Sequence, residues 1–455
     1  MRSIFFSAAL AALVAAGAQA ADAPHTKALA AGYKAAFLCS GVFNAGQTEA
    51  QVAADDLEGI YPEYQALVRT LPATVDRGAK TVSVPFDDKL PPRIAAWRPG
   101  LGCTQLPIGA DVSGVAKLPK LAIQPPSSPS GQAAFAEGDE GATAPGPAKL
   151  GPALAKAFDV SAYGGATTAV LVVKDGKIIG EQYRPGWTMH TPQRTWSAAK
   201  SLTATVVGRA VQLGKVKVEA PANIPEWQAP GDPRAKITLA QLMHMGSGLW
   251  TDGPGNRTDE VYVGGGAVTE WATAMPLEAA PGSRFNYANN DTLLAARSVR
   301  ASLGDGKAAL EFPFAEVLWK IGMRHTTPET DWQGSYILSS QVWTTARDLA
   351  RLGLLYQNDG VWNGQRLLPA GWSTFVATPA PVQPPGDRGY GAFFWLYREK
   401  VGLPADTYVM NGNRGQFVFI VPSRKVIIVR RGFDSAGGPR FDEAKFARDV
   451  LAALD

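Results

Sequence analysis

Ser197 and Lys200 have the residue types and the spacing of a nucleophile and its proton acceptor. They stand three apart in "TWSAAKSLTATVV", at the head of an Ala-rich apolar segment. If a helix begins at Ser197, both side chains lie on one face, about a hydrogen bond apart. A Ser hydroxyl needs a neighbour that takes its proton, and Lys can do so only when its pKa is lowered, as burial and a helix N-terminus both do. The alternative is an ordinary helix start, because Ser and Lys are common there.

A second candidate segment follows ninety residues later. In "PGSRFNYANNDTLLAARSV", Tyr287 and Asn289 stand between a turn and a helix-like run. A Tyr beside a Lys can be partly stabilised as phenolate, which is a reason for the two side chains to be neighbours. The sequence contains no G-x-S-x-G motif and no Cys with a convincing His partner, so other nucleophile signatures are missing.

The elements that would position these residues are strands near both ends of a large region and helices between them. Residues 167–184 form two apolar runs around Asp175-Gly176, and residues 415–432 form two more around Pro422-Ser423-Arg424; both predict β-hairpins. Helical patterns cover 344–358 and 441–455. We therefore expect an α+β fold with an antiparallel sheet covered by helices on both faces, plus a small N-terminal region.

The chain divides into four parts by composition. Residues 1–20 resemble a secretory signal peptide, with Ala18-Gln19-Ala20 as the cleavage site, so a periplasmic or secreted protein is expected. Residues 21–110 form an N-terminal accessory region with a helix-like stretch at 26–38 and strand-like pieces at 80–86 and 93–99. Residues 111–152 are rich in Pro, Gly and Ala and predict a linker or a long ordered loop. The main domain is expected at 153–455.

Cys39 and Cys103 are the two cysteines of the chain, and in an exported protein an isolated pair is more often bonded than free. Their disulfide would close the N-terminal region; the alternative is two unpaired buried thiols. Four scattered His residues lack ligand spacing, so neither a metal site nor a cofactor is expected.

Charge and hydropathy limit the classes of molecule that the protein is expected to bind. The net charge is +4 in 455 residues, without a dense basic tract, which argues against nucleic acid and anionic membranes. After the signal, no apolar run of spanning length follows, and no Cys stands directly after the cut, so no stable membrane anchor is expected. A small molecule is the expected partner, and the oligomeric state stays open.

Three motifs in order resemble those of the serine β-lactamases and penicillin-binding proteins. "WSAAKS", "FNYANND" and "MNGNRGQFVFIVP" are similar to the Ser-x-x-Lys, Tyr-x-Asn and strand motifs of that superfamily. The Tyr-x-Asn form resembles the class C branch, and "ITLAQLMHMGSGL", "TTARDLARLGLLYQNDGVWNGQRLLP" and "GNRGQ" resemble most closely the 6-aminohexanoate-dimer hydrolase and carboxylesterase group. The resemblance covers residues 153–455 and implies a β-lactamase/transpeptidase-like fold; the region before Pro107 finds no place in it.

The resemblance assigns roles to individual residues. Ser197 would be the nucleophile, Lys200 the proton acceptor in acylation, and Tyr287 the group that relays protons to the leaving group and the deacylating water. Asn289 would hold Lys200 and the acyl side of the substrate. The backbone N–H of Asn413, after Gly412, would complete an oxyanion hole with that of Ser197, and the missing Cβ of Gly412 would let the substrate approach.

One position departs from the family pattern. The third motif usually opens with Lys or His, which binds a substrate carboxylate, whereas this chain has Met410 there and Asn411 in place of Thr or Ser. Arg414 is either a replacement cation or a solvated loop residue. The departure favours a small ester or amide without that anion over a β-lactam or D-Ala-D-Ala peptide, and a non-catalytic binding module is the third alternative.

Several other residues have a structural and a functional interpretation. Asp348, with Arg347 and Arg351, predicts a salt-bridged helix face rather than a site. Four aromatic side chains are candidates for an acyl pocket, although packing is the commoner role of such residues: Trp196, Trp250, Tyr262 and Trp271.

Overall fold

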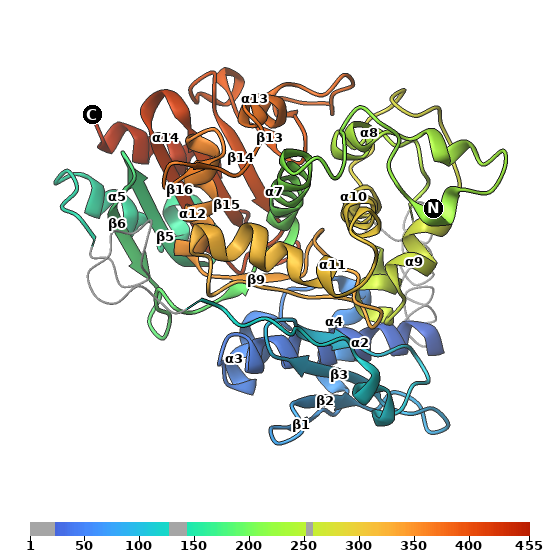
Figure 1. The fold of residues 1–455 in the computed structure, drawn as a ribbon. Coiled ribbons are helices and arrows are strands. Elements are labelled where there is room, and N and C mark those ends of the chain that lie inside the picture. Colours follow the sequence, from blue (N-terminus) through green and yellow to red (C-terminus); the bar gives the residue numbers. More distant parts are fainter. Residues whose placement is uncertain (1–22, 127–142, 252–257) are drawn as a thin grey trace, which may run out of the picture.

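A seven-stranded antiparallel sheet forms the centre of the molecule (Figure 1). The computed structural model describes residues 23–126, 143–251 and 258–455, so the predicted signal peptide lies outside the described residues. The strand order is β12-β13-β14-β15-β16-β5-β6, which pairs the last strands of the chain with the first strands of the main domain. The strands are β5 (Thr167–Lys174), β6 (Lys177–Tyr183), β12 (Gly389–Tyr390), β13 (Trp395–Leu396), β14 (Tyr408–Gly412), β15 (Gln416–Val421) and β16 (Val426–Gly432).

Both predicted hairpins are confirmed. β5 pairs with β6 across Asp175-Gly176, where both residues adopt positive φ, and β15 pairs with β16 across a short turn at Pro422–Arg424. Successive side chains of these strands enter different cores, as the two-residue period requires. Val170 and Val172 pack on one face and Leu171 and Val173 on the other. Such doubly buried strands read as continuous apolar runs in the sequence.

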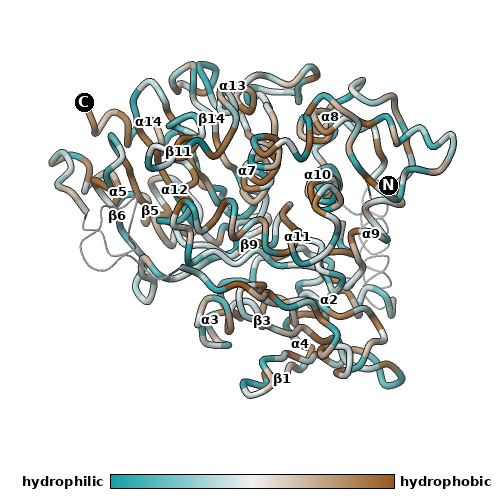
Figure 2. Tube along the Cα trace, viewed as in Figure 1, coloured by the Kyte–Doolittle hydropathy of each residue, from teal (hydrophilic) through white to brown (hydrophobic). Residues whose placement is uncertain are grey.

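Helices cover both faces of the sheet, as expected. On one face lie α5 (Leu150–Lys156) and α14 (Glu443–Ala453). On the other lie α7 (Ala199–Gln212) and α12 (Ala346–Gln357), whose apolar sides face inward in Figure 2. Because the α7 side belongs to the larger core, the residues at the start of α7 are fixed from several directions.

A helical layer lies beyond α7 on the side away from the sheet (Figure 1). A small three-stranded sheet in the order β7-β9-β8 is formed by Gln193–Arg194, Val342–Thr344 and Thr327–Pro328, and its central strand β9 lies below α12 and α7 in the view of Figure 1. α10 packs against both α7 and α8. The helices of this layer are α8 (Leu239–Met243), α9 (Val268–Trp271), α10 (Asn289–Ser302) and α11 (Lys307–Phe312), with a π-helical turn at Glu260–Gly264. Nearer the large sheet lie α13 (Trp372–Ala377) and the hairpin of β10 (Val361–Trp362) and β11 (Gln365–Arg366).

In the N-terminal region one long helix, α2, packs against a four-stranded antiparallel sheet, and two short helices follow it. The order of the sheet is β1-β2-β3-β4, and Cys39 of α2 is bonded to Cys103 of β4 (S–S 1.97 Å). The predicted helix at 26–38 is longer, because Pro24 starts it and apolar residues continue beyond the predicted end. β2 and β3 match the two predicted strands, whereas β1 and β4 were not predicted. The elements are α2 (Pro24–Phe43), α3 (Glu49–Asp55), α4 (Pro62–Thr70), β1 (Thr74–Asp76), β2 (Thr81–Val84), β3 (Arg93–Arg98) and β4 (Gly102–Gln105).

Buried polar contacts join the N-terminal region to the main domain. The carboxylate of Glu329 accepts hydrogen bonds from Ser40 Oγ (2.6 Å), Asn44 Nδ2 (2.8 Å) and Cys103 N (2.9 Å). The guanidinium of Arg93 donates to the carbonyl oxygen of Val263 (3.0 Å). A carboxylate that accepts several hydrogen bonds fixes its donors, so this region is an integral part of the molecule.

The salt-bridged face predicted on α12 is found in altered form. Asp348 and Arg351 form a buried pair (2.6 Å), while Arg347 pairs with Glu181 of β6 (2.5 Å). Asp348 also accepts a hydrogen bond from the backbone of His325 (2.9 Å). The face is therefore buried between elements, which the helical period alone did not indicate.

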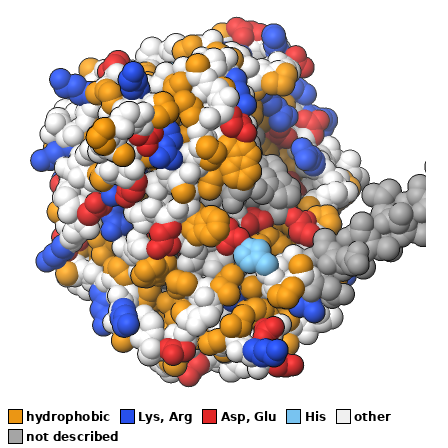
Figure 3. Space-filling view, turned by 90° about the vertical axis from the view of Figure 1, so that its right-hand side faces the viewer, with side chains coloured by type: hydrophobic (Ala, Val, Ile, Leu, Met, Phe, Trp, Pro, Cys, Tyr) orange, Lys and Arg blue, Asp and Glu red, His pale blue; other side chains and the backbone are white. Residues whose placement is uncertain are grey.

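The described residues give no support for a membrane span or a metal centre. None of their helices combines the length and apolarity needed to cross a bilayer, and no cluster of His, Cys, Asp or Glu among them is suited to a metal ion. On the face seen in Figure 3, basic and acidic side chains are interspersed rather than gathered by sign.

Candidate active site

The backbone at Ser197 turns sharply between a strand and a helix. β7 ends at Arg194, the turn η2 covers Trp196–Ala198, and α7 begins at Ala199, so Ser197 precedes the helix instead of starting it. Trp196 adopts a φ of +50°, a region that bulky side chains rarely occupy. Such strain persists only where the surroundings hold it in place.

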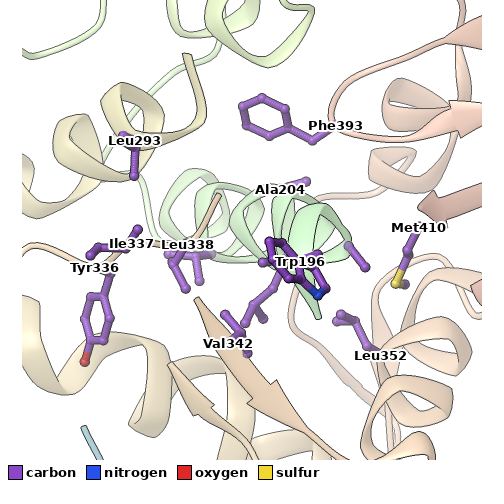
Figure 4. Packing of buried hydrophobic residues seen from close by; sticks show 14 of the residues in the cluster. Trp196, Ala204, Leu293, Tyr336, Ile337, Leu338, Val342, Leu352, Phe393 and Met410 are labelled. Atoms are coloured by element: carbon purple, nitrogen blue, oxygen red, sulfur yellow. The ribbon is translucent and has the colours of Figure 1, made fainter. Parts of the chain in front are cut away.

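Packing on three sides holds that turn. The ring of Trp196 lies 5.7 Å from the ring of Phe37 in α2, and the Arg194 guanidinium lies 4.2 Å from the Trp196 ring centre. Arg194 also donates to Ser340 Oγ (2.9 Å). Figure 4 shows Trp196 among the apolar side chains around α7. The nucleophile candidate is therefore presented by a turn that the N-terminal region helps to support.

Lys200 is the centre of the polar contacts. Its Nζ lies 3.3 Å from Ser197 Oγ and donates to Asn289 Oδ1 (2.6 Å) and to the carbonyl oxygen of Ser339 (3.0 Å). Lys200 is buried, and desolvation lowers its pKa to about 7, against a smaller opposite effect of Asp291. A substantial fraction is therefore neutral near neutral pH and able to take a proton.

Tyr287 lies at the same place but in a different protonation state from the one expected. Its ring centre is 5.1 Å from Lys200 Nζ, and it is hydrogen-bonded to Ser197. Desolvation nevertheless raises the pKa of Tyr287 to about 12, outweighing the lowering effects of the hydrogen bonds to Ser197 and Trp395. The phenol is neutral at physiological pH, so the phenolate suggested by the sequence is not favoured.

Asn289 and Asp291 both come from the first turn of α10. Asn289 reaches Lys200, whereas Asp291 is buried and accepts from the hydroxyl (2.7 Å) and the backbone N–H (3.3 Å) of Ser247. Burial raises the pKa of Asp291 to about 7. The first turn of α10 thus supplies both a direct partner for Lys200 and a nearby group that modulates its charge.

Close backbone packing explains why position 412 is a glycine. A Cβ at this position would lie 2.2 Å from the carbonyl oxygen of Thr195 and 3.0 Å from the backbone nitrogen of Ala198. The missing side chain therefore lets β14 pack directly on the turn that carries Ser197. Asn413 follows as an exposed residue of the hairpin turn, and its side chain accepts from the backbone of Arg414 (2.9 Å).

Neither Met410 nor Arg414 gives the substituted third motif a free cation. Met410 has none of its surface exposed and lies in the core beside α7 (Figure 4). Arg414 is buried, and its guanidinium donates to the carbonyl oxygens of Asp56 (3.2 Å), Glu58 (2.7 Å) and Asp434 (3.2 Å). Arg414 is therefore not a solvated loop residue, because its guanidinium links the hairpin to the N-terminal region.

The aromatic candidates separate into two groups. Trp196 lines a cavity beside Gly412, and Tyr262 is buried with its hydroxyl 2.5 Å from Ser339 Oγ. Trp250 and Trp271 are instead exposed, by 42% and 39%. The Ser339 carbonyl was missed from the sequence, since a backbone acceptor leaves no residue-type signal, whereas Asp291 stood within the Tyr-x-Asn segment and could have been found there.

The fold and the motif residues define a β-lactamase-type hydrolase. Residues 153–448 match the family described as Beta-lactamase. The chain therefore belongs to the β-lactamase family, which includes serine β-lactamase-like and penicillin-binding-protein-like hydrolases.

Individual relatives agree with the family assignment. The 6-aminohexanoate-dimer hydrolase of Paenarthrobacter ureafaciens is 25% identical over 257 residues, which are 50% of this chain and 61% of the relative, so the match spans less than two thirds of that protein. A Bacillus anthracis protein described as a "putative 6-aminohexanoate-dimer hydrolase" aligns with a TM-score of 0.54 at 23% identity, over 63% of this chain and 78% of its own. A class C β-lactamase aligns with a TM-score of 0.51 at 17% identity, over 68% and 96%. The two solved structures support the fold, and the N-terminal region lies outside the family match.

Proposed function

We propose that the protein is an exported serine hydrolase that cleaves a small uncharged ester or amide through an acyl-enzyme intermediate on Ser197. The observation that carries the proposal is the 3.3 Å contact between Ser197 Oγ and the buried Lys200 amine, whose pKa is lowered to about 7. A neutral amine at this distance can accept the hydroxyl proton as the oxygen attacks a carbonyl carbon.

The remaining steps use groups around that pair. In the proposed reaction, the backbone N–H groups of Ser197 and Asn413 stabilise the oxyanion. Tyr287, neutral because its pKa is about 12, relays a proton from Lys200 to the leaving group as the tetrahedral intermediate collapses. Water then attacks the acyl-enzyme, its proton passes to the same groups, and the carboxylic acid leaves while Ser197 recovers its proton.

An uncharged substrate is favoured by the third motif. Met410 is in the core, and the guanidinium of Arg414 is occupied by three backbone carbonyl oxygens. A substrate carboxylate would find no charge-assisted partner in either side chain. Hydrolysis of β-lactams or D-Ala-D-Ala peptides is therefore the second candidate, supported by the family membership alone.

Export is part of the proposal. A disulfide between Cys39 and Cys103 supports an oxidising compartment, where such bonds persist. Sequencing the N-terminus of the secreted or periplasmic protein tests it, and the expected first residue is Ala21.

The activity is tested by intact-mass analysis after mixing with p-nitrophenyl acetate, linear amides and β-lactams. We expect one acyl adduct on Ser197 with the acetate ester, followed by turnover, and no adduct on Ser197→Ala. An alanine variant that kept wild-type turnover would refute the nucleophile, and a permanent adduct without turnover would identify a sensor instead of an enzyme.

A further inference from the structure

A cavity of about 630 Å³ lies against the turn that carries Ser197, lined by Trp196 but not by Ser197 itself, and has walls from two parts of the chain. Trp196, Gly412 and Asn413 line it next to Ser197, and Tyr33 and Tyr61 of the N-terminal region line it opposite. A cavity of this size is in the range that holds small-molecule substrates. The N-terminal region lies outside residues 153–448, so this wall is an addition to the family domain.

The wall from the N-terminal region is fixed in place. Arg414, in the same hairpin turn as Asn413, donates to the carbonyl oxygens of Asp56 (3.2 Å) and Glu58 (2.7 Å). The carbonyl oxygen of Gly59 accepts from the backbone of Ala436 (2.7 Å). Because Gly59 itself lines the cavity, these contacts hold both walls at a set distance.

The cavity lies on the acyl side of the reaction. Tyr287, the proposed proton donor to the leaving group, packs against Tyr390 (5.9 Å) and Trp395 (5.5 Å). None of these three residues is among those that line the cavity. Asn413, the proposed oxyanion donor, does line the cavity. A substrate whose carbonyl oxygen lies at Asn413 and whose leaving group lies at Tyr287 would extend its acyl part toward the cavity.

Tyr33 offers an unused hydrogen-bond donor in this wall. The residue is 2% exposed, its ring stacks on Phe37 (4.3 Å), and its hydroxyl has no hydrogen-bond partner among the described residues. Burial raises the pKa of the Tyr33 hydroxyl, which keeps it protonated. An unpaired buried hydroxyl is unfavourable until an acceptor binds it, and because the Tyr33 hydroxyl is itself enclosed, neighbouring side chains must shift to admit a ligand atom.

The charged side chains that line the cavity balance to no net formal charge, three basic and three acidic: Arg388, Arg414, Arg440, Asp434, Asp442 and Glu443. Arg388 pairs with Glu443 (2.5 Å), and Asp434 pairs with Arg430 (2.8 Å). The groups next to the nucleophile are aromatic rings and amides. This distribution suits an uncharged acyl group that carries an acceptor such as an amide carbonyl.

We propose that the N-terminal region forms the far wall of the acyl site, where Tyr33 selects uncharged acyl groups that carry a hydrogen-bond acceptor. The inference rests on the proposed function, because it takes Ser197 as the acylated residue. Tyr33 is then a specificity-determining residue outside the family domain, and Tyr61 limits the width of the acyl group beside it.

The test compares p-nitrophenyl esters of straight-chain acids of graded length, each with and without an acetamido group at the far end. In the wild type, we expect one chain length at which the acetamido ester has a higher kcat/KM than its plain counterpart. In Tyr33→Phe this advantage falls by about 2- to 13-fold, the worth of one neutral hydrogen bond. Phe retains the stacking on Phe37, so the fold is preserved.

Tyr64→Phe is the matched control. Tyr64 belongs to the same ring cluster, 6.1 Å from the ring of Tyr33, but its hydroxyl donates to Asp259 (2.6 Å) and it does not line the cavity. This variant should keep the wild-type preference. An equal acetamido preference in Tyr33→Phe and wild type would overturn the inference, as would an equal loss in both variants.

A binding measurement separates this inference from the proposed function. Calorimetry with Ser197→Ala, alone and combined with Tyr33→Phe, compares the affinity for the unreacted acetamido ester. We expect the same 2- to 13-fold loss without any turnover. Equal affinities would reject the Tyr33 assignment even if the wild type is an esterase. The expected loss of affinity, together with a wild type that does not hydrolyse the ester, would reject only the proposed function.

Discussion

The two walls of the active-site cleft are built in opposite ways. The wall that carries Ser197, Lys200 and Tyr287 belongs to the family domain, where short motifs place polar side chains at or just before the starts of α7 and α10 within one hydrogen-bonded cluster. The facing wall comes from a disulfide-closed region that reaches the cleft through buried rings and backbone carbonyls. The difference teaches that the proposed chemistry follows from motif spacing, whereas the shape of the proposed acyl site depends on long-range packing.

Lys200→Ala is expected to have the largest effect, because it removes the proton acceptor and leaves the facing wall intact. We expect kcat/KM for p-nitrophenyl acetate to fall about 10⁴-fold, the upper end for a general base. Circular dichroism should show a folded protein. A loss below tenfold would mean that another group accepts the proton.

The disulfide is the corresponding test of the facing wall. Replacing Cys39 and Cys103 together by Ser removes a bridge across 64 residues and should lower the free energy of unfolding by about 4 kcal/mol. Urea titration measures it, and the plain and acetamido esters should lose activity together as the wall unfolds. Unchanged stability would show that the polar contacts of Glu329 alone hold the region.

Gly412→Ala tests how closely the two elements of the catalytic wall are packed. A Cβ 2.2 Å from the carbonyl oxygen of Thr195 must push β14 away from the nucleophile, and a displacement of this kind costs about 10²-fold in rate. Stopped-flow kinetics with p-nitrophenyl acetate measures the loss. The control is Gly151→Ala in α5, where nothing lies within 4 Å of the added atom. A Gly412→Ala variant with wild-type kinetics would contradict the packing described here.

Asp291→Asn should give the smallest change, a shift in pH dependence. Activity requires neutral Lys200, so kcat/KM should rise as pH increases through about 7, the lowered pKa of Lys200. Asp291 raises that pKa, so its neutral replacement should move the rising limb to lower pH. A limb that moved to higher pH, or stayed in place in a folded variant, would exclude this role for Asp291.

The family domain was largely predictable from its sequence. Apolar runs on either side of short turns gave the hairpins of β5–β6 and β15–β16, and the family motifs gave the neighbourhood of Ser197, Lys200 and Asn289. These features are local, or are fixed by motifs whose meaning does not depend on distant residues.

Other features depended on contacts far apart in the chain. Nothing in the residues around Arg414 indicates that its donors meet carbonyl oxygens more than 350 positions away. The phenol of Tyr287 was expected to be partly ionised, because a neighbouring Lys lowers the pKa of a phenol. The desolvation that raises the pKa of Tyr287 has no sequence signal. Burial and long-range backbone contacts have no short sequence pattern, so the wall formed by Tyr33 and Tyr61 was also missed.

The link from Arg414 to the carbonyl oxygens of Asp56 and Glu58 also bears on the order of folding. Residues 56 and 58 leave the ribosome more than 350 residues before position 414, roughly 20–70 s earlier at ordinary synthesis rates. During that time the carbonyl oxygens of Asp56 and Glu58 lack the Arg414 guanidinium that binds them in the folded protein. The cavity wall formed by the N-terminal region is therefore completed late in folding, after the β14–β15 hairpin has formed. Truncated chains that stop before this hairpin should have no esterase activity.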